Sequence, residues 1–137
     1  MDTKYSRLHI EKAKRFLEAA ENDLEDGFHD ASISHSYYAM HHSARALLLL
    51  IGKSPRKHSG VINILWQEVE SFSEVSKDDI KKLSSALRQR VECDYGVALE
   101  PAREDVAREI FNNAINFVDE VENELKKWKN KKCTQKP

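Results

Sequence analysis

The sequence predicts an all-α fold, namely a five-helix, mostly antiparallel up-and-down bundle. Apolar residues recur at intervals of three and four along almost the whole chain, as they do on one face of a helix. The 137 residues include only four glycines and three prolines, too few for a turn-rich β protein. The breaks between the apolar stripes are short, and short connections place consecutive helices antiparallel.

Two glycines mark the expected ends of the first two helices. The apolar stripe of the first helix contains Ile10, Ala13, Leu17, Ala20 and Leu24. The stripe of the second contains Ile33, Tyr37, Met40, Ala44, Leu47 and Ile51. Gly27 and Gly52 follow these stripes, where helices commonly end on a left-handed residue. The chain should break at Pro55, because a proline biases the residue before it away from helical backbone.

The third and fourth helices are indicated by their stripes and by a cap between them. The third stripe contains Ile62, Leu65, Val69 and Phe72, and the fourth contains Ile80, Leu83 and Leu87. Ser76 is the expected N-cap of the fourth helix, with Asp79 three residues later in a capping-box-like position. Gly96 is the expected end of the fourth helix.

A fifth helix completes the bundle, and a basic tail follows it. Pro101 suits the first turn of this helix. Its stripe contains Val106, Ile110, Ala114, Phe117, Val121, Leu125 and Trp128. Six lysines and no acidic residue lie between Lys126 and Pro137, whereas the first thirty residues lean acidic. We expect one helical domain over residues 1–128 and a basic tail over 129–137 that is either frayed or in contact with phosphates.

Composition limits the class of protein. A chain of this length fits a single domain, and its 22 basic and 23 acidic residues nearly balance, so the global charge does not call for nucleic acid. Cys93 and Cys133 form neither a zinc nor a disulfide pattern, which indicates a reducing compartment. The N-terminus is charged and lacks an apolar signal core, and the longest apolar run, residues 46–51, cannot span a bilayer. We expect a soluble, cytoplasmic protein without membrane contact.

The second helix carries a row of residues that its core stripe does not explain. The row repeats at intervals of three and four and contains His35, Tyr38, His42, Arg45 and Leu49. We interpret this row as an outward face, while His41 lies on the shoulder of the core stripe. Aromatic and arginine residues on an outward face are typical of interfaces, although a partly solvated surface is the alternative.

The histidines of this region do not form a metal site. His41 and His42 are neighbours on a helix and therefore diverge by about 100°. His35 and His42 share a face but stand two turns apart, roughly 10 Å by helix rise, which is too far for one ion. The sequence also lacks a phosphate-binding glycine loop and a dinucleotide fingerprint, so we expect neither a metal nor another cofactor.

An ion pair is expected where the fourth helix should be apolar. Continuing its stripe beyond Leu87 leads to Arg90 and then to Asp94, spaced i and i+4, with Tyr95 adjacent. A buried ion pair is weak evidence for stability and is often kept for specificity or function. Alternatively, the helix end emerges into solvent and the pair contributes little.

His58 opens the third helix and is in register with its stripe. The segment His58-Ser59-Gly60 places an imidazole, a hydroxyl and free amide groups at a helix start, which can bind an anion. A helix cap without a ligand is the alternative reading.

Two segments carry a resemblance to a known family. SYYAMHHSARALLLLIGKSPRKHSGVI and LRQRVECDYG, followed by an acidic-to-apolar last helix, resemble small stand-alone archaeal and bacterial proteins of the HEPN superfamily (higher eukaryote and prokaryote nucleotide-binding). Tyr-Tyr-Ala-Met, residues 44–47, residues 57–60 and Asp94-Tyr95 carry the likeness, which extends from about residue 5 to 125. The resemblance implies a five-helix bundle that dimerises and places its site in the cleft between subunits.

The resemblance also implies an activity that this sequence puts in doubt. Many HEPN relatives are metal-independent ribonucleases with an arginine, four to six residues and then a histidine, near the end of a helix like the fourth one. No arginine of this chain is followed by histidine at that distance, and Arg90 precedes Val-Glu-Cys-Asp-Tyr instead. A general base should titrate near neutrality, and a carboxylate paired with an arginine is a weak base. We therefore expect ribonuclease activity to be weak or absent.

Our leading hypothesis is a homodimeric HEPN-fold module that binds RNA, a nucleotide or a partner protein. The row on the second helix and the cluster of Arg90, Asp94 and Tyr95 would form its working surface. The alternative is an endoribonuclease toxin in which Arg90 stabilises the transition state and His42 or His58 replaces the missing histidine. A third hypothesis pairs the protein with a small nucleotidyltransferase as toxin and antitoxin, with Tyr95 accepting a nucleotide.

Overall fold

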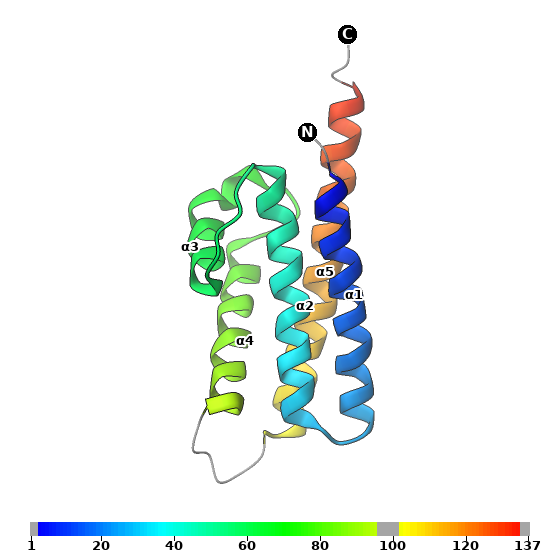
Figure 1. Cartoon of the computed structure of the whole chain (residues 1–137), viewed down its shortest axis with the longest axis vertical. Coiled ribbons are helices and arrows are strands. Elements are labelled where there is room, and N and C mark those ends of the chain that lie inside the picture. The colour runs from blue at the N-terminus through cyan, green and yellow to red at the C-terminus, as the bar shows by residue number, and fades with distance from the viewer. Residues whose placement is uncertain (1–2, 96–101, 135–137) are drawn as a thin grey trace.

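The computed structural model describes residues 3–95 and 102–134, and this part of the chain contains five α-helices, one short 3₁₀ turn and no strand (Figure 1). The elements are α1 (Lys4–Glu25), α2 (His29–Leu50), α3 (His58–Glu68), η1 (Val69–Ser71), α4 (Lys77–Tyr95) and α5 (Glu104–Thr134). Consecutive long helices run up and down, and the predicted all-α bundle of five helices is confirmed. None of the described helices is long and apolar enough to cross a membrane.

The central element is α2, which contacts each of the other four α-helices (Figure 1). Thirteen of its 22 residues are buried, more than one apolar stripe could supply. Small side chains let α1 approach closely, and two serine hydroxyls cross the gap to backbone carbonyls. Ser6 Oγ donates to Ala46 O at 2.8 Å, and Ser32 Oγ donates to Ala20 O at 2.8 Å. These bonds satisfy the serine hydroxyls that the close packing of α1 and α2 would otherwise leave without water.

The predicted ends of the first two helices are confirmed. Gly27 and Gly52 have φ angles of 82° and 73°, the left-handed backbone that glycine adopts without strain. After α1, Phe28 N donates to Asp23 O at 2.8 Å, and after α2, Lys53 N donates to Leu48 O at 2.9 Å. Both bonds satisfy carbonyls that the helix itself leaves without a partner.

The predicted start of α4 is also confirmed, whereas the limits of α5 differ from expectation. Ser76 N donates to Asp79 Oδ2 at 2.8 Å, and Asp79 N donates back to Ser76 Oγ at 3.3 Å, which is a capping box. The first residue of α5 is Glu104, later than the start expected at Pro101, which lies outside the described residues together with Gly96. At its other end α5 continues through Thr134 and projects beyond the bundle, so the expected tail from residue 129 is helical as far as 134 (Figure 1).

A buried carboxylate fastens the segment before α4 to α5. Glu124 is 2% exposed, although it is an ionisable residue. In the sequence it lies between Val121 and Leu125 of the apolar stripe. Its Oε1 accepts the backbone N–H of Glu74 at 2.7 Å, and its Oε2 accepts the indole N–H of Trp128 at 2.9 Å. Donors on both oxygens stabilise the carboxylate inside the bundle.

A second carboxyl group of α5 holds a proton to an unusually high pH. Burial, and next a hydrogen bond with Asp79, raise the pKa of Glu120 to about 8. The folded protein keeps this proton up to that pH, whereas the unfolded chain releases it near the ordinary value of 4.5. Glu120 therefore makes the free energy of unfolding fall as the pH rises from about 4.5 to about 8.

We expect Glu120→Gln to stabilise the protein at pH 8 and to change little at pH 4. Glutamine cannot ionise, so the variant lacks the unfavourable charge, and the gain should be about 1 kcal/mol because partial exposure reduces the effect. Urea unfolding at several pH values measures the difference, with the exposed neighbour Asp119→Asn as the matched control. Parallel pH profiles for wild type and Glu120→Gln would contradict the assignment.

Candidate functional site

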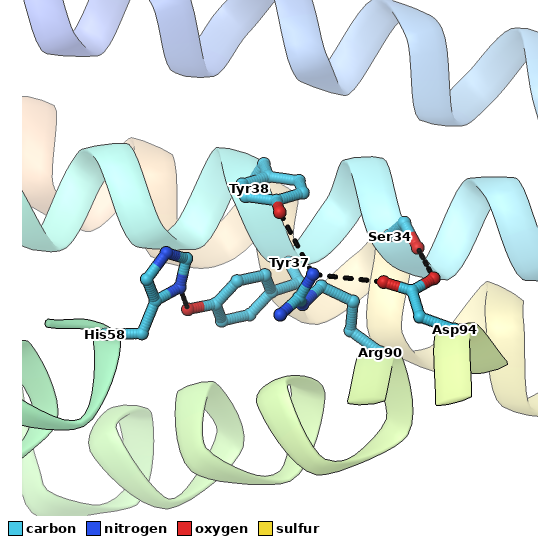
Figure 2. Close-up of polar contacts among 6 residues, drawn as sticks. All are labelled: Ser34, Tyr37, Tyr38, His58, Arg90 and Asp94. Atoms are coloured by element: carbon cyan, nitrogen blue, oxygen red, sulfur yellow. Dashed lines mark hydrogen bonds and ion pairs between the residues drawn. The ribbon is translucent and has the colours of Figure 1, made fainter. Parts of the chain in front are cut away.

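Arg90 lies in the last part of α4 and faces α2, where its guanidinium is held by two oxygen atoms. Nη1 donates to the Tyr38 hydroxyl at 3.0 Å and to Asp94 Oδ2 at 3.0 Å (Figure 2). Ser34 Oγ in turn donates to Asp94 Oδ1 at 3.4 Å. The side chain of Arg90 is 15% exposed and that of Asp94 is 35% exposed, so the i, i+4 pair expected from the sequence forms in a partly buried place.

Two tyrosine rings form the surroundings of this guanidinium. The Cζ atom of Arg90 lies 5.4 Å from the ring centroid of Tyr37 and 5.3 Å from that of Tyr38. Aromatic faces attract a cation, and an arginine remains charged at any physiological pH. Arg90 Nε is buried without a hydrogen-bond partner, although unsatisfied buried donors are unfavourable. The cluster thus contains a permanent positive charge with unused hydrogen-bonding capacity.

His58, the first residue of α3, reaches the same cluster through Tyr37. Its Nδ1 lies 2.5 Å from the Tyr37 hydroxyl, while the other end of the tyrosine ring meets Arg90 (Figure 2). The imidazole of His58 also stacks on that of His41, with ring centroids 4.1 Å apart and an interplanar angle of 12°. Tyr37 therefore lies between His58 and Arg90.

The imidazoles near this cluster are neutral at physiological pH. Burial lowers the pKa of His41 to about 3 and that of His42 to about 4. Burial also lowers the pKa of His58, and the charges of Arg90 and Arg45 add to this effect. The same burial raises the pKa of the Tyr37 hydroxyl, so that group keeps its proton. The positive charge near the imidazoles consequently comes from Arg90, Arg45 and, beside His42, Lys12.

The row predicted to face outward is instead half-buried, and much of it faces α1. His35, Tyr38, His42, Arg45 and Leu49 are all of intermediate exposure. Phe16 of α1 stacks against three of them, with ring centroids 5.5 to 5.9 Å away. The outward orientation was therefore wrong, because α2 is covered on more than one side and its second row meets another helix. An interface role for the remaining exposed edges stays a prediction.

His42 belongs to a different environment from His58. Its Nδ1 lies 3.0 Å from Nδ1 of His9 on α1, and its ring is nearly parallel to Phe16 with an interplanar angle of 8°. His42 is thus engaged with α1, whereas His58 contacts the tyrosine that Arg90 packs against. Among the described residues, no three His, Cys, Asp or Glu side chains converge as metal ligands would.

Comparison with known proteins identifies the family. A model described as the HEPN domain matches residues 6–125. The chain belongs to the HEPN family. A UPF0332 protein from Archaeoglobus fulgidus is 37% identical over 120 residues, covering 88% of this chain and 94% of the relative. The HEPN bundle is also found in the crystal structure of an archaeal HEPN homologue, with a TM-score of 0.70 and 22% identity over 91% of this chain and 99% of that one.

A further HEPN relative has a name that refers to function. This Methanocaldococcus jannaschii protein is described as a candidate toxin and is 30% identical over 117 residues, covering 85% of this chain and 86% of the relative. The matched HEPN region of the present chain includes His58, Arg90 and Asp94. Tyr95 is the last residue of α4, and its side chain lies outside the described part of the structure.

Three residues in and around the candidate site were not predicted from the sequence. Tyr37 is a member of the apolar stripe, and its hydroxyl gave no separate signal. His9 and Phe16 lie on α1, far away in sequence from the residues they contact. The spacing of Tyr37, His41 and Arg45 at i, i+4 and i+8 was the available signal, because it places three polar groups in line on one helix.

Proposed function

We propose that this HEPN protein is a homodimeric, cytoplasmic module that binds a phosphate group of RNA or of a nucleotide at Arg90, without strong intrinsic cleavage. The observation that carries the proposal is a partly buried guanidinium flanked by two tyrosine rings, with a buried Nε that has no hydrogen-bond partner. Arginine suits phosphate recognition because its planar fork presents several donors in fixed directions. Tyr38 is only partly buried, so its ring offers aromatic surface for an unpaired base.

The charges around Arg90 allow a phosphate to replace Asp94 as the partner of its guanidinium. Asp94 holds Arg90 by one oxygen only, and its own side chain is 35% exposed. Because Asp94 is the more exposed partner and holds Arg90 through one oxygen, an incoming phosphate can compete with it for the guanidinium. The neutral imidazoles add no charge, and Arg90 supplies the main attraction for the anion.

We expect Arg90→Met to weaken the binding of a short single-stranded RNA by about tenfold, the effect of losing a hydrogen bond to a charged group. Fluorescence anisotropy with labelled oligouridylate measures the affinity, and sedimentation equilibrium on the same samples reports whether the protein is a dimer. Arg88→Met is the matched control, since it removes the same charge from an exposed position on the same helix. Its effect should stay within about threefold, as for a peripheral phosphate contact.

Equal losses in the two variants would contradict a specific role for Arg90. A wild-type protein that binds oligouridylate no better than Arg90→Met would contradict the proposal as well. A protein that stays monomeric at all concentrations would contradict the homodimeric part of the proposal.

Cleavage is the second candidate, because His58 and Arg90 both contact Tyr37. In that version Arg90 stabilises the transition state and His58 supplies the base that the HEPN motif lacks here. We expect wild type to leave RNA as intact as Arg90→Ala and His58→Ala do, measured by gel electrophoresis of end-labelled RNA without added metal. Products formed by wild type and by neither variant would favour the ribonuclease.

A partner protein is a further proposal that the name of the M. jannaschii relative supports. A small nucleotidyltransferase would form a toxin–antitoxin pair with this chain and transfer a nucleoside monophosphate from a nucleoside triphosphate to the Tyr95 hydroxyl, which loses its proton while pyrophosphate leaves. We expect coexpression with a transferase encoded beside the gene to give one modified tyrosine, which mass spectrometry of intact protein and peptides detects. Unmodified Tyr95 in a stable complex would contradict the transfer, and Tyr95→Phe is the control.

A further inference from the structure

Four polar side chains contact one another in a row between the end of α2 and the start of α3. Arg45 Nε donates to His41 Nε2 at 2.8 Å. His41 Nδ1 lies 3.4 Å from the Tyr37 hydroxyl, and the same hydroxyl lies 2.5 Å from His58 Nδ1. The two central members are His41 and Tyr37. His41 uses one ring nitrogen toward each neighbour, whereas Tyr37 uses its single hydroxyl toward both.

Arg45, the first member of the row, determines the direction of every hydrogen bond in it. Arginine has donors and no acceptor, so His41 Nε2 accepts and carries no hydrogen. The neutral ring of His41 then has its hydrogen on Nδ1 and donates it to the Tyr37 hydroxyl. That hydroxyl has one hydrogen, which it donates to His58 Nδ1. His58, when neutral, must carry its own hydrogen on Nε2.

His41 and His58 are both neutral for physical reasons. His41 is 4% exposed, and burial with positive neighbours lowers its pKa to about 3. Among the described residues, the charged and titratable groups around His58 are Tyr37, Tyr38, His41, His42 and Arg45 of α2 and Arg90 of α4. Burial and the two arginines lower the pKa of His58. Neither His41 nor His58 is therefore in the cationic form, with a hydrogen on both ring nitrogens, at physiological pH.

We propose that Arg45, His41 and Tyr37 are positioning residues that hold His58 as a neutral imidazole with its hydrogen on Nε2. In this form His58 offers one N–H donor to an anionic phosphate oxygen and has no nitrogen available as a base. Nδ1 is occupied by the tyrosine hydroxyl, and Nε2 already carries hydrogen. The part about the ligand rests on the proposed function, whereas the position of the hydrogen does not.

The loop before α3 keeps Arg45 in this role. Its Nη1 donates to the carbonyl of Pro55 at 2.7 Å, and its Nη2 donates to the carbonyl of Arg56 at 3.3 Å. These bonds orient the guanidinium so that Nε points at His41. The conformation of the α2–α3 loop is thereby linked to the hydrogen-bonding state of His58.

Long-range ¹H–¹⁵N correlation spectra of the ligand-free protein at pH 7.5 test the position of the hydrogen. We expect His58 to be protonated on Nε2 in at least about nine molecules of ten, the ratio that one net hydrogen bond provides. In Arg45→Met, His41 can adopt either tautomer, so the row can reverse and the two forms of His58 should come within about threefold of each other. Arg56→Met, at an exposed neighbouring position, is the matched control and should match wild type.

Tyr37→Phe gives an independent readout, in case Arg45→Met does not fold. The variant keeps the ring that packs on Arg90 and removes only the hydroxyl. Without the hydroxyl, His58 Nδ1 loses the bond that favours its neutral form, so the pKa of His58 should rise toward its ordinary value in an NMR titration. Wild-type His58 with its hydrogen on Nδ1, or an unchanged His58 pKa in Tyr37→Phe, would overturn the proposal.

Binding of oligouridylate tests whether His58 donates a hydrogen bond to the phosphate. His58→Gln keeps an N–H donor and should bind within about threefold of wild type, whereas His58→Leu should bind about tenfold more weakly. Equal affinities of the two variants would overturn the donor role. Because the tautomer is read without RNA, a failure of Arg90 to bind RNA is distinguished from a failure of the hydrogen-bond row.

Discussion

The burial of α2 among four helices is the constraint on which the rest of the structure depends. A helix with one covered face can send its polar side chains into water, but α2 has neighbours on several sides. Burial disfavours polar side chains without partners, although within the described part of α2 the buried Ser36 hydroxyl is left without a hydrogen bond. Ser32 donates to a backbone carbonyl of α1, His42 pairs with His9, and Tyr37 meets His58. The polar groups of one helix thus organise the contacts of its neighbours.

The same burial sets the electrostatics of the candidate site. Withdrawal from water disfavours charged imidazoles, so His41 and His42 are neutral and act as hydrogen-bonding groups. Arginine does not lose its proton under such conditions, and Arg90 remains charged between two tyrosine rings. A site with permanently charged arginines and neutral imidazoles is suited to holding an anion. Acid–base catalysis would need a group that titrates near neutrality.

The fold was predictable because its signals are local. The stripes, the two left-handed glycines and the capping box of Ser76 and Asp79 each depend on residues within one or two helical turns. The ion pair of Arg90 and Asp94 was predictable for the same reason, since both lie on one helix four residues apart. The start of α5 at Glu104 and its continuation to Thr134 differ from the limits that the local signals indicated.

The amino-acid sequence by itself determined the number of helices, the ends of α1 and α2, the starts of α3 and α4, and the presence of an arginine at a position expected to be apolar. Only the tertiary structure decided which side of α2 faces another helix, because periodicity describes a face without naming its neighbour. It turned the row of Tyr38 and His42 toward Phe16, and it placed Tyr37 between His58 and Arg90. The tautomer of His58 has the same origin, because the row of hydrogen bonds from Arg45 runs along α2 and reaches His58 only through the contact of Tyr37 with α3.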